Sequence, residues 1–256
     1  MHARTLPSRH GALWLVAGFQ LFRRAPMALT GLTFAYLMLV IVLNLIPGIG
    51  PFLLPALLPT LTALLANGCR AIESGRQVTP AVLFDHVSEQ RIGLIRLGGI
   101  HLIGSLVLVM ISMATGTKLE LADGMTQEEA AVLLQDIALL LLFASPLLMA
   151  FWFAPLLTLW DNVSAGKSVF FSFVASWRNW RAFLAYGLAI LLFGALVPGF
   201  LLVLAHLVSP GLAGVLSGVF RMLMLFVLAP VLVASIYLSY RDVFHTPAVD
   251  VIVTDE

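Results

Sequence analysis

Long apolar stretches alternate with short polar segments along the whole chain, and six of these stretches carry no charged residue or only one. A helix needs about 20 mostly apolar residues to cross the hydrocarbon core of a bilayer. Because lipid offers no hydrogen bonds, a spanning segment must satisfy its backbone groups as helix. The pattern therefore predicts an all-α, polytopic transmembrane helical bundle of about six spans. These spans lie near residues 27–46, 52–69, 97–114, 137–160, 182–207 and 218–240.

The composition excludes a soluble globular domain. Of the 256 residues, 61% are hydrophobic and 11% are charged, whereas soluble domains average roughly 45–50% and about 25%. The net charge of +1 excludes an extended basic surface for nucleic acid. Cys69 is the only cysteine, so no disulfide can form within the chain. No small-residue cleavage site follows the first apolar run, which we therefore expect to remain as the first span.

The basic residues lie mainly on one side of the predicted bundle. Of the 14 Lys and Arg residues, 12 precede the first span, follow the sixth, or lie between spans two and three or four and five. The loop between spans three and four instead carries Lys118, Glu120, Asp123, Glu128 and Glu129. Because Lys and Arg concentrate on the cytoplasmic side of membranes, we predict that both termini are cytoplasmic. Residues 246–256 then form a short acidic cytoplasmic tail.

Two of the predicted helices are longer than the membrane is thick. Thr126 and Glu129 form the pattern of a capping box, which begins a helix that runs to residue 160. Ser209 and Pro210 are a cap and a first helical residue for another helix of similar length. At 1.5 Å per residue each helix is roughly 50 Å long, so both are expected to emerge on the outer side unless they tilt steeply.

Prolines interrupt two of the spans. Pro55 and Pro59 lie within the second span, and Pro146 and Pro155 lie within the fourth. Each proline removes a helical hydrogen bond and favours a kink. Kinked helices either frame a cavity or pack around one another, and the residues leave both interpretations open.

The chain contains a weak internal similarity. The motif "GRQV" at 75–78 matches "GKSV" at 166–169, and "GSLV" at 104–107 matches "GALV" at 194–197. The hypothesis is a parallel internal repeat of one interfacial amphipathic helix and two spans, used three times. The alternative is chance similarity within apolar sequence.

The interfacial helices of this unit are expected within residues 10–24, 79–91 and 168–181. Their aromatic side chains and nearby arginines suit the headgroup layer. The last segment has a polar stripe at helical spacing, which consists of Ser168, Ser172, Ser176 and Asn179.

Few polar residues fall inside the predicted spans. The candidates are Arg221, Asp136, His101, His206 and Asn44. Counted from the cytoplasmic ends of their helices, Arg221 and Asp136 lie at similar depth near the outer boundary. Arg221 is interpreted as a snorkelling arginine, as the partner of Asp136, or as a functional charge in a cavity. We predict no catalytic residues, no cofactor and no metal site, because no motif for them is present.

Three further stretches carry a family resemblance. They are "HGALWLVAGFQLFRRAP" at 10–26, "IPGIGPFL" at 46–53 and "GCRAIESG" at 68–75. With these the chain resembles an uncharacterised family of six-span proteobacterial inner-membrane proteins, distantly similar to the YciC-like proteins. The resemblance implies the fold and a location in a bacterial inner membrane, and it implies no activity.

Two classes of function follow from these features. The first is a non-catalytic inner-membrane protein that acts as an assembly, scaffold or envelope-homeostasis factor. The alternative is a small transporter or lipid-handling protein that uses a cavity framed by the proline-kinked helices. The expected partners are membrane lipids, together with a membrane-protein partner or a second copy of the chain, and not nucleic acid.

The predicted topology can be tested by cysteine labelling. In a Cys69→Ser background, Ala122→Cys should react with an impermeant maleimide in intact spheroplasts, because the third-to-fourth loop is placed outside. Ala165→Cys should not react. Equal labelling of the two variants would exclude six spans with cytoplasmic termini.

Overall fold

The computed structural model describes residues 3–117 and 126–245, and within these ranges the chain is helical without strands. The α-helices are α1 (Arg9–Arg24), α2 (Pro26–Asn44), α3 (Gly50–Glu73), α4 (Pro80–Leu83), α5 (Arg91–Thr115), α6 (Gln127–Trp152), α7 (Ala154–Trp160), α8 (Ala165–Arg178), α9 (Trp180–Leu191), α10 (Val197–Val208), α11 (Pro210–Leu223) and α12 (Ala229–Phe244). Two π-helical segments, η1 (Leu192–Leu196) and η2 (Met224–Leu228), continue α9 into α10 and α11 into α12. The predicted all-α fold is confirmed. The predicted acidic tail, and Lys118, Glu120 and Asp123 of the acidic loop, lie outside the described residues.

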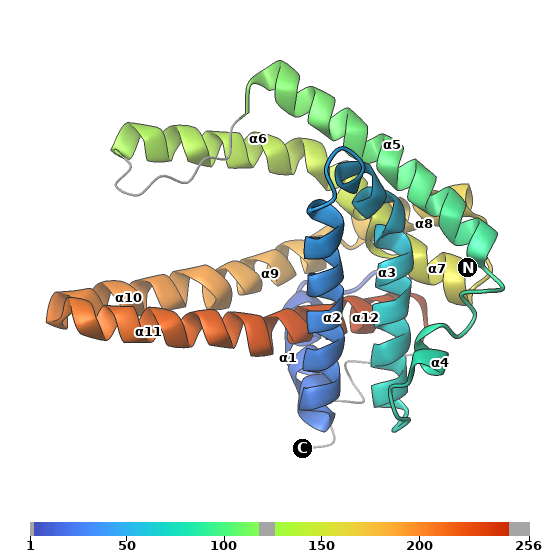
Figure 1. Ribbon diagram of the computed structural model, residues 1–256, viewed down its shortest axis with the longest axis horizontal. Helices are drawn as coiled ribbons and strands as arrows, with labels where there is room; N and C mark the ends of the chain where they lie inside the picture. The colour runs from blue at the N-terminus through green and yellow to red at the C-terminus, as the bar shows by residue number, and fades with distance from the viewer. Residues whose placement is uncertain (1–2, 118–125, 246–256) are drawn as a thin grey trace.

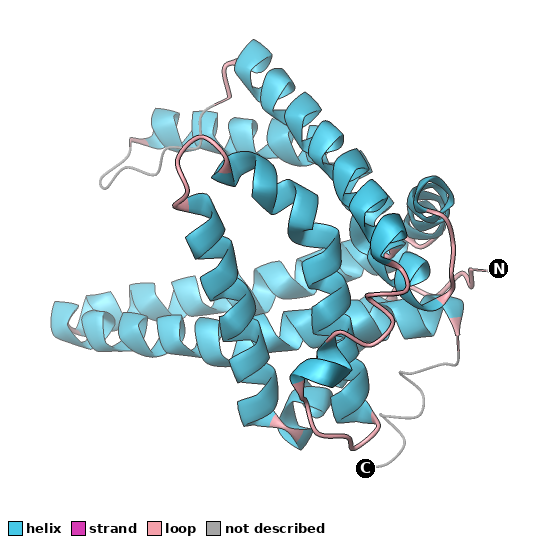
Figure 2. Ribbon diagram, turned by 45° about the vertical axis from the view of Figure 1, so that its right-hand side comes forward, coloured by secondary structure: helices cyan, strands magenta, loops and turns pink. Residues whose placement is uncertain are grey.

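Six helical stretches in the described chain are long and apolar enough to cross a membrane. They are Pro26–Asn44, Gly50–Glu73, Arg91–Thr115, Gln127–Trp160, Trp180–Val208 and Pro210–Phe244. They form three hairpins, which are α2 with α3, α5 with α6–α7, and α9–α10 with α11–α12. The hairpins share one packed base and their tips diverge (Figures 1 and 2). A short helix (α1, α4 or α8) precedes each hairpin, as the repeat hypothesis requires.

The long fourth and sixth spans begin at the predicted caps. Glu129 donates its backbone N–H to the Thr126 hydroxyl at 3.3 Å, and Thr126 donates its backbone N–H to the Glu129 carboxylate at 2.8 Å. The Ser209 hydroxyl accepts the backbone N–H of Leu212 at 3.3 Å. These bonds satisfy amide groups that the first helical turn leaves without partners.

The buried core lies at the base of the hairpins rather than along their whole length. Its largest fully buried side chains include Trp14, Phe153, Leu156, Leu238 and Tyr240. By contrast, η1, η2, α6 and α11 contain no buried residue. The outer halves of the spans therefore present apolar side chains to lipid, while the base packs as a protein interior.

Helix α1 is part of this core and not a peripheral interfacial helix. It packs between α9 and α12. A Cβ atom at Gly11 would overlap the carbonyl oxygen of Ala182, and one at Gly18 would lie 2.7 Å from the carbonyl oxygen of Val231. Only glycine permits this close backbone approach.

The serine stripe of α8 faces inwards, against α6 and α7. Ser168, Ser172, Ser176 and Asn179 are all buried, whereas Trp177 on another face is 63% exposed. The Ser172 hydroxyl accepts the backbone N–H of Phe153 at 2.9 Å and donates to the carbonyl of Met149 at 2.8 Å. The Ser172 hydroxyl thus bridges the Phe153 N–H and the Met149 carbonyl, which would bond to each other in an unbroken helix. Here the helix breaks before Pro155.

Side chains from neighbouring helices also satisfy carbonyls that other prolines leave free. Pro59 has no N–H for the carbonyl of Pro55, and the Nδ1 atom of His101 in α5 lies 2.8 Å from that oxygen. His101 is therefore a structural histidine that donates to α3. Its ring also packs edge-on against Phe151 at 4.6 Å between ring centroids.

A side chain of α2 likewise donates a hydrogen bond to a carbonyl that a proline leaves free in the last span. Pro230 deprives the Phe226 carbonyl of its helical donor, and the Thr30 hydroxyl donates to that oxygen at 3.3 Å. The ring of Phe226 stacks on Phe34 at 4.9 Å, so α2 contacts this site through two side chains.

The helix expected over residues 79–91 is confined to α4, which is the four residues Pro80–Leu83. The Thr79 hydroxyl caps it by accepting the N–H of Val82 at 3.4 Å. The Asn67 side chain then donates to the carbonyls of Leu83 and Asp85, each at 2.9 Å. These bonds hold the chain in turns beyond Leu83, which ends the helix.

Ser172→Ala should lower the thermal unfolding temperature in detergent, because it leaves the Phe153 N–H without its acceptor, while the Met149 carbonyl keeps only the Ser176 hydroxyl as donor at 3.2 Å. Loss of a buried hydrogen-bonding partner costs roughly 1–3 kcal/mol. Ser164→Ala is the matched control, because Ser164 is exposed and its side chain makes no capping bond. Equal unfolding temperatures for the two variants would contradict the bridging role of Ser172.

Candidate functional site

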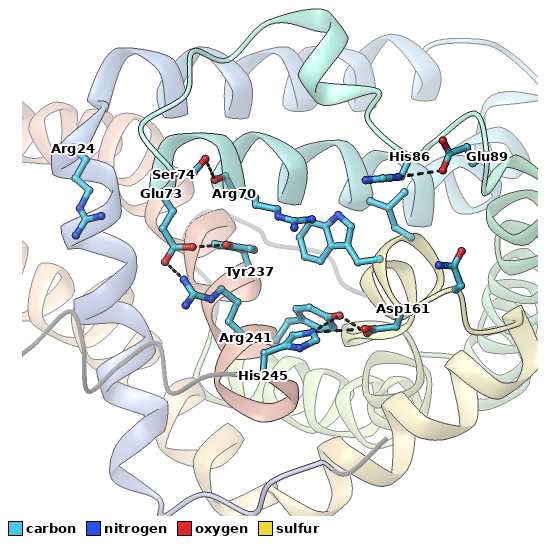
Figure 3. Close-up of a pocket in the computed structure, with 14 residues that line it drawn as sticks. Arg24, Arg70, Glu73, Ser74, His86, Glu89, Asp161, Tyr237, Arg241 and His245 are labelled. Carbon is cyan, nitrogen blue, oxygen red and sulfur yellow. Dashed lines mark hydrogen bonds and ion pairs between the residues drawn. The ribbon is translucent and has the colours of Figure 1, made fainter.

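A charged cavity of about 740 Å³ opens at the base of the bundle. Its walls come from the ends of α1, α3, α7 and α12 and from the turns that follow α4. Figure 3 shows that its charged side chains converge from segments far apart in the sequence. Its size is within the roughly 300–1,000 Å³ typical of ligand sites.

Glu73 at the end of α3 forms the first charged group of the cavity. Its carboxylate pairs with the Arg241 guanidinium and accepts a hydrogen bond from the Tyr237 hydroxyl. The Glu73 and Arg241 side chains are 18% and 26% exposed, so the pair is partly buried. These two contacts of Glu73 connect α3 to α12 in the cavity wall (Figure 3).

Asp161, directly after α7, forms the second group. Its carboxylate accepts a hydrogen bond from the Tyr240 hydroxyl, and the Nε2 atom of His245 lies 3.7 Å from it. The same His245 atom is 3.0 Å from the Tyr240 hydroxyl oxygen. The structure thus brings Asp161 and Arg241, which lie at the ends of two different spans, into one cavity.

Trp160 forms an aromatic wall between these groups. Its indole N–H donates to the side-chain oxygen of Asn67 at 3.0 Å, which fixes the ring. The guanidinium of Arg70 lies over the ring, 5.1 Å from its centroid. Stacking of this kind orients a guanidinium without neutralising its charge.

Three arginines and three acids line the cavity, and of the arginines only Arg241 forms an ion pair with one of the acids. Each acid contacts a neighbouring side chain. Glu73 pairs with Arg241, Asp161 accepts a hydrogen bond from Tyr240, and Glu89 lies 3.2 Å from the imidazole of His86. Arg24 and Arg70 are exposed, and neither guanidinium forms an ion pair with any residue that the structure describes. The cavity therefore offers two cations to an anionic group that enters it.

A second polar network lies beside the cavity and fixes the N-terminal segment. Fully buried Asp242 accepts a hydrogen bond from the Trp14 indole at 2.9 Å and lies 2.8 Å from the Nδ1 atom of His10. Arg4 completes this network at 3.8 Å from the carboxylate, and its backbone N–H donates to the Val243 carbonyl at 2.9 Å. This arrangement holds α1 and the residues before it against the end of α12.

The polar residues singled out in the spans do not gather at one site. His101 bonds to α3 as described, Asn44 donates to the carbonyl of Val40 at 2.8 Å within its own helix, and His206 is exposed. No ion pair joins Arg221 to Asp136, and the outer half of α6 is well separated from α11 (Figure 1). The interpretation of these two residues as partners is therefore not realised in the structure.

The cavity residues were largely missed by sequence reasoning. Arg24 and Arg70 were counted only as basic residues that orient the protein, and Glu73 was not considered. One sequence feature could have indicated the cavity: Glu73 follows Arg70 by three residues at the end of a span. Among the described residues, no group of three or more His, Cys, Asp or Glu side chains is placed to hold a metal ion.

A protein of Burkholderia thailandensis named a probable inner membrane protein is 34% identical to this chain over 253 residues. The match covers 93% of this chain and 92% of the relative. The chain belongs to the family of this inner-membrane protein. No protein-family model matches the chain, and no solved structure matches it. The more distant YciC-like relationship of this inner-membrane family stays a prediction.

A double-mutant cycle tests the contact that closes the cavity wall. Glu73→Leu and Arg241→Leu should each lower the stability in detergent by roughly 1–3 kcal/mol, because each leaves a partly buried charge without its partner. The double variant should recover part of that loss, since the stability changes caused by substitutions at contacting residues do not add. Glu128→Leu, at an exposed acid on α6, is the control. Additive losses would contradict the pairing of Glu73 with Arg241.

Proposed function

We propose that this protein is a non-catalytic, lipid-handling protein of the inner membrane that binds the phosphate-bearing headgroup of an anionic lipid in the cavity at its base. The supporting observation is the pair of guanidiniums, Arg24 and Arg70, that have no acidic partner in a cavity whose acids are all engaged. Arginine binds phosphate through a planar fork of N–H donors.

The position of the cavity favours a lipid ligand. It lies where α3 and α12 end, and Arg70 and Arg241 occupy the last turns of these helices. The distribution of Lys and Arg supports a cytoplasmic location for this end of the bundle. Anionic lipids give the cytoplasmic leaflet a negative surface potential, and this attracts basic residues at the membrane surface.

The bonding of the acids supports binding rather than catalysis. A general base needs a carboxylate or imidazole that is free to take a proton from a substrate. Arg241 and two tyrosine hydroxyls already occupy the carboxylates of Glu73 and Asp161. These contacts make the acids parts of the cavity wall.

An assembly, scaffold or envelope-homeostasis role is the second candidate. The observation that favours it is the divergence of the hairpins, which leaves apolar side chains such as Val215 and Met222 of α11 exposed far from the core. A membrane-protein partner or a second copy of the chain would then cover these faces.

Native mass spectrometry of the full chain, purified in mild detergent, separates the two candidates. The wild type should retain added phosphatidylglycerol, and Arg24→Leu/Arg70→Leu should weaken this binding about tenfold or more, because each arginine near a membrane surface contributes about 1 kcal/mol. Arg9→Leu, an exposed arginine outside the cavity, should bind like the wild type.

Competition with a soluble phosphate compound shows whether the site binds a lipid headgroup or free phosphate compounds. Glycerol phosphate should compete only weakly if the acyl chains contribute to binding, and strongly if the site takes free phosphate compounds. Unchanged phosphatidylglycerol binding by the double variant would overturn the lipid proposal. A stoichiometric protein partner that the double variant retains would support the scaffold role instead.

A further inference from the structure

A separate groove lies on the third hairpin, far from the charged cavity. It has a volume of about 480 Å³ and lies where η1 and α10 face α11 and η2. Both π-helical segments border it, and each ends two residues before a proline, Pro198 or Pro230. Single π-helical turns widen a helix locally and are frequent at functional sites.

Arg221 is the one charged residue among those that line this groove. It is exposed, and its guanidinium forms no ion pair with any residue in ranges 3–117 and 126–245. The remaining lining side chains are small or apolar, and they include Gly194, Ser217 and Phe220. The groove is therefore apolar with a single cation at its edge.

The helical distance places Arg221 at the membrane boundary opposite the cavity. Arg241, which is held by Glu73 in the cavity wall, lies 20 residues further along the same continuous helix. At 1.5 Å per residue this separation is about 30 Å, which equals the thickness of the hydrocarbon core. The anions available at that depth are the phosphates of the other leaflet.

We propose that this groove binds one phospholipid of the leaflet opposite the cavity, with the lipid phosphate on Arg221 and one acyl chain along the groove. At this boundary an exposed arginine meets water and lipid phosphates rather than hydrocarbon, so it can bind a headgroup without the cost of a charge at the bilayer centre. Gly194 and Ser217 leave room between the two helices, and Leu202 and Leu225 supply apolar contact for a chain. The site is independent of the headgroup cavity at the base.

Photocrosslinking of the full chain in lipid nanodiscs tests the site. The probe is phosphatidylglycerol with a diazirine on one acyl chain, and the comparison probe is the matching diacylglycerol, which lacks phosphate. The phospholipid probe should label residues 194–229 in the wild type. Arg221→Leu should lower this yield about fivefold, and Arg221→Lys should restore most of it, because one basic residue near headgroups contributes about 1 kcal/mol. The diacylglycerol yield should not change between these variants.

A second variant tests the groove itself. Gly194→Leu adds a side chain at a residue that lines the groove, and its first added carbon would be in ordinary contact, 3.4 Å from Leu228. It should lower labelling by both probes. Gly187→Leu, at an exposed glycine of α9 outside the groove, is the matched control and should label normally.

Two results would overturn the proposal. One is equal phospholipid labelling of the wild type and Arg221→Leu. The other is loss of a co-purifying protein from Arg221→Leu without any change in lipid labelling, which would assign Arg221 to a partner carboxylate. Arg24→Leu/Arg70→Leu should leave labelling of the groove unchanged, so this result does not depend on the cavity at the base.

Discussion

A backbone carbonyl that loses its helical donor inside a bilayer finds no water to replace it, and this constraint determines how the spans pack. Prolines create such carbonyls in several spans, and the replacement donors at Pro59 and Pro230 are His101 and Thr30. At the break between α6 and α7, Ser172 supplies both a donor and an acceptor. These bonds connect α5 to α3, α2 to the last span, and α8 to α6–α7. At these three sites the break in the helical bonding is therefore also a point of attachment between helices, whereas at Pro146 the Leu142 carbonyl accepts a hydrogen bond from Ser145 of its own helix.

Many polar groups at the base satisfy one another in a similar way, although the side-chain oxygen of Gln20 and one carboxylate oxygen of Asp242 are buried without a hydrogen-bond donor among the described residues. Asp242 is held by His10 and Trp14, and the acids of the cavity have partners of their own. Arg24 and Arg70 at one end of the spans, and Arg221 at the other, form no ion pair with any part of the chain that is described. Phosphate lies in the headgroup layers at both of these depths. One chemical principle thus explains both proposed lipid sites, although they share no residue.

Local features of this fold could be predicted because nearby residues determine them. Hydropathy identified six spans, and the Thr126 capping box and the Ser209 cap marked where two long helices begin. The direction of the α8 stripe was not predictable, because it depends on the open backbone bond that Ser172 fills in another helix. The cavity was missed for a similar reason. Glu73 and Arg241 are 168 residues apart, and neither stands out among its neighbours in the sequence.

The burial of α1 has a consequence for biosynthesis. Its neighbours are α9 and α12, and its buried Trp14 bonds to Asp242, which lies 228 residues later in the chain. Because α12 follows α1 to α11 in the chain, α1 can reach α2 and α3 early in synthesis but can form its contacts with α12 only after α12 has been made. The base is therefore completed only after α12 is available, because its core joins α1 to the helix that lies furthest from it in the described sequence.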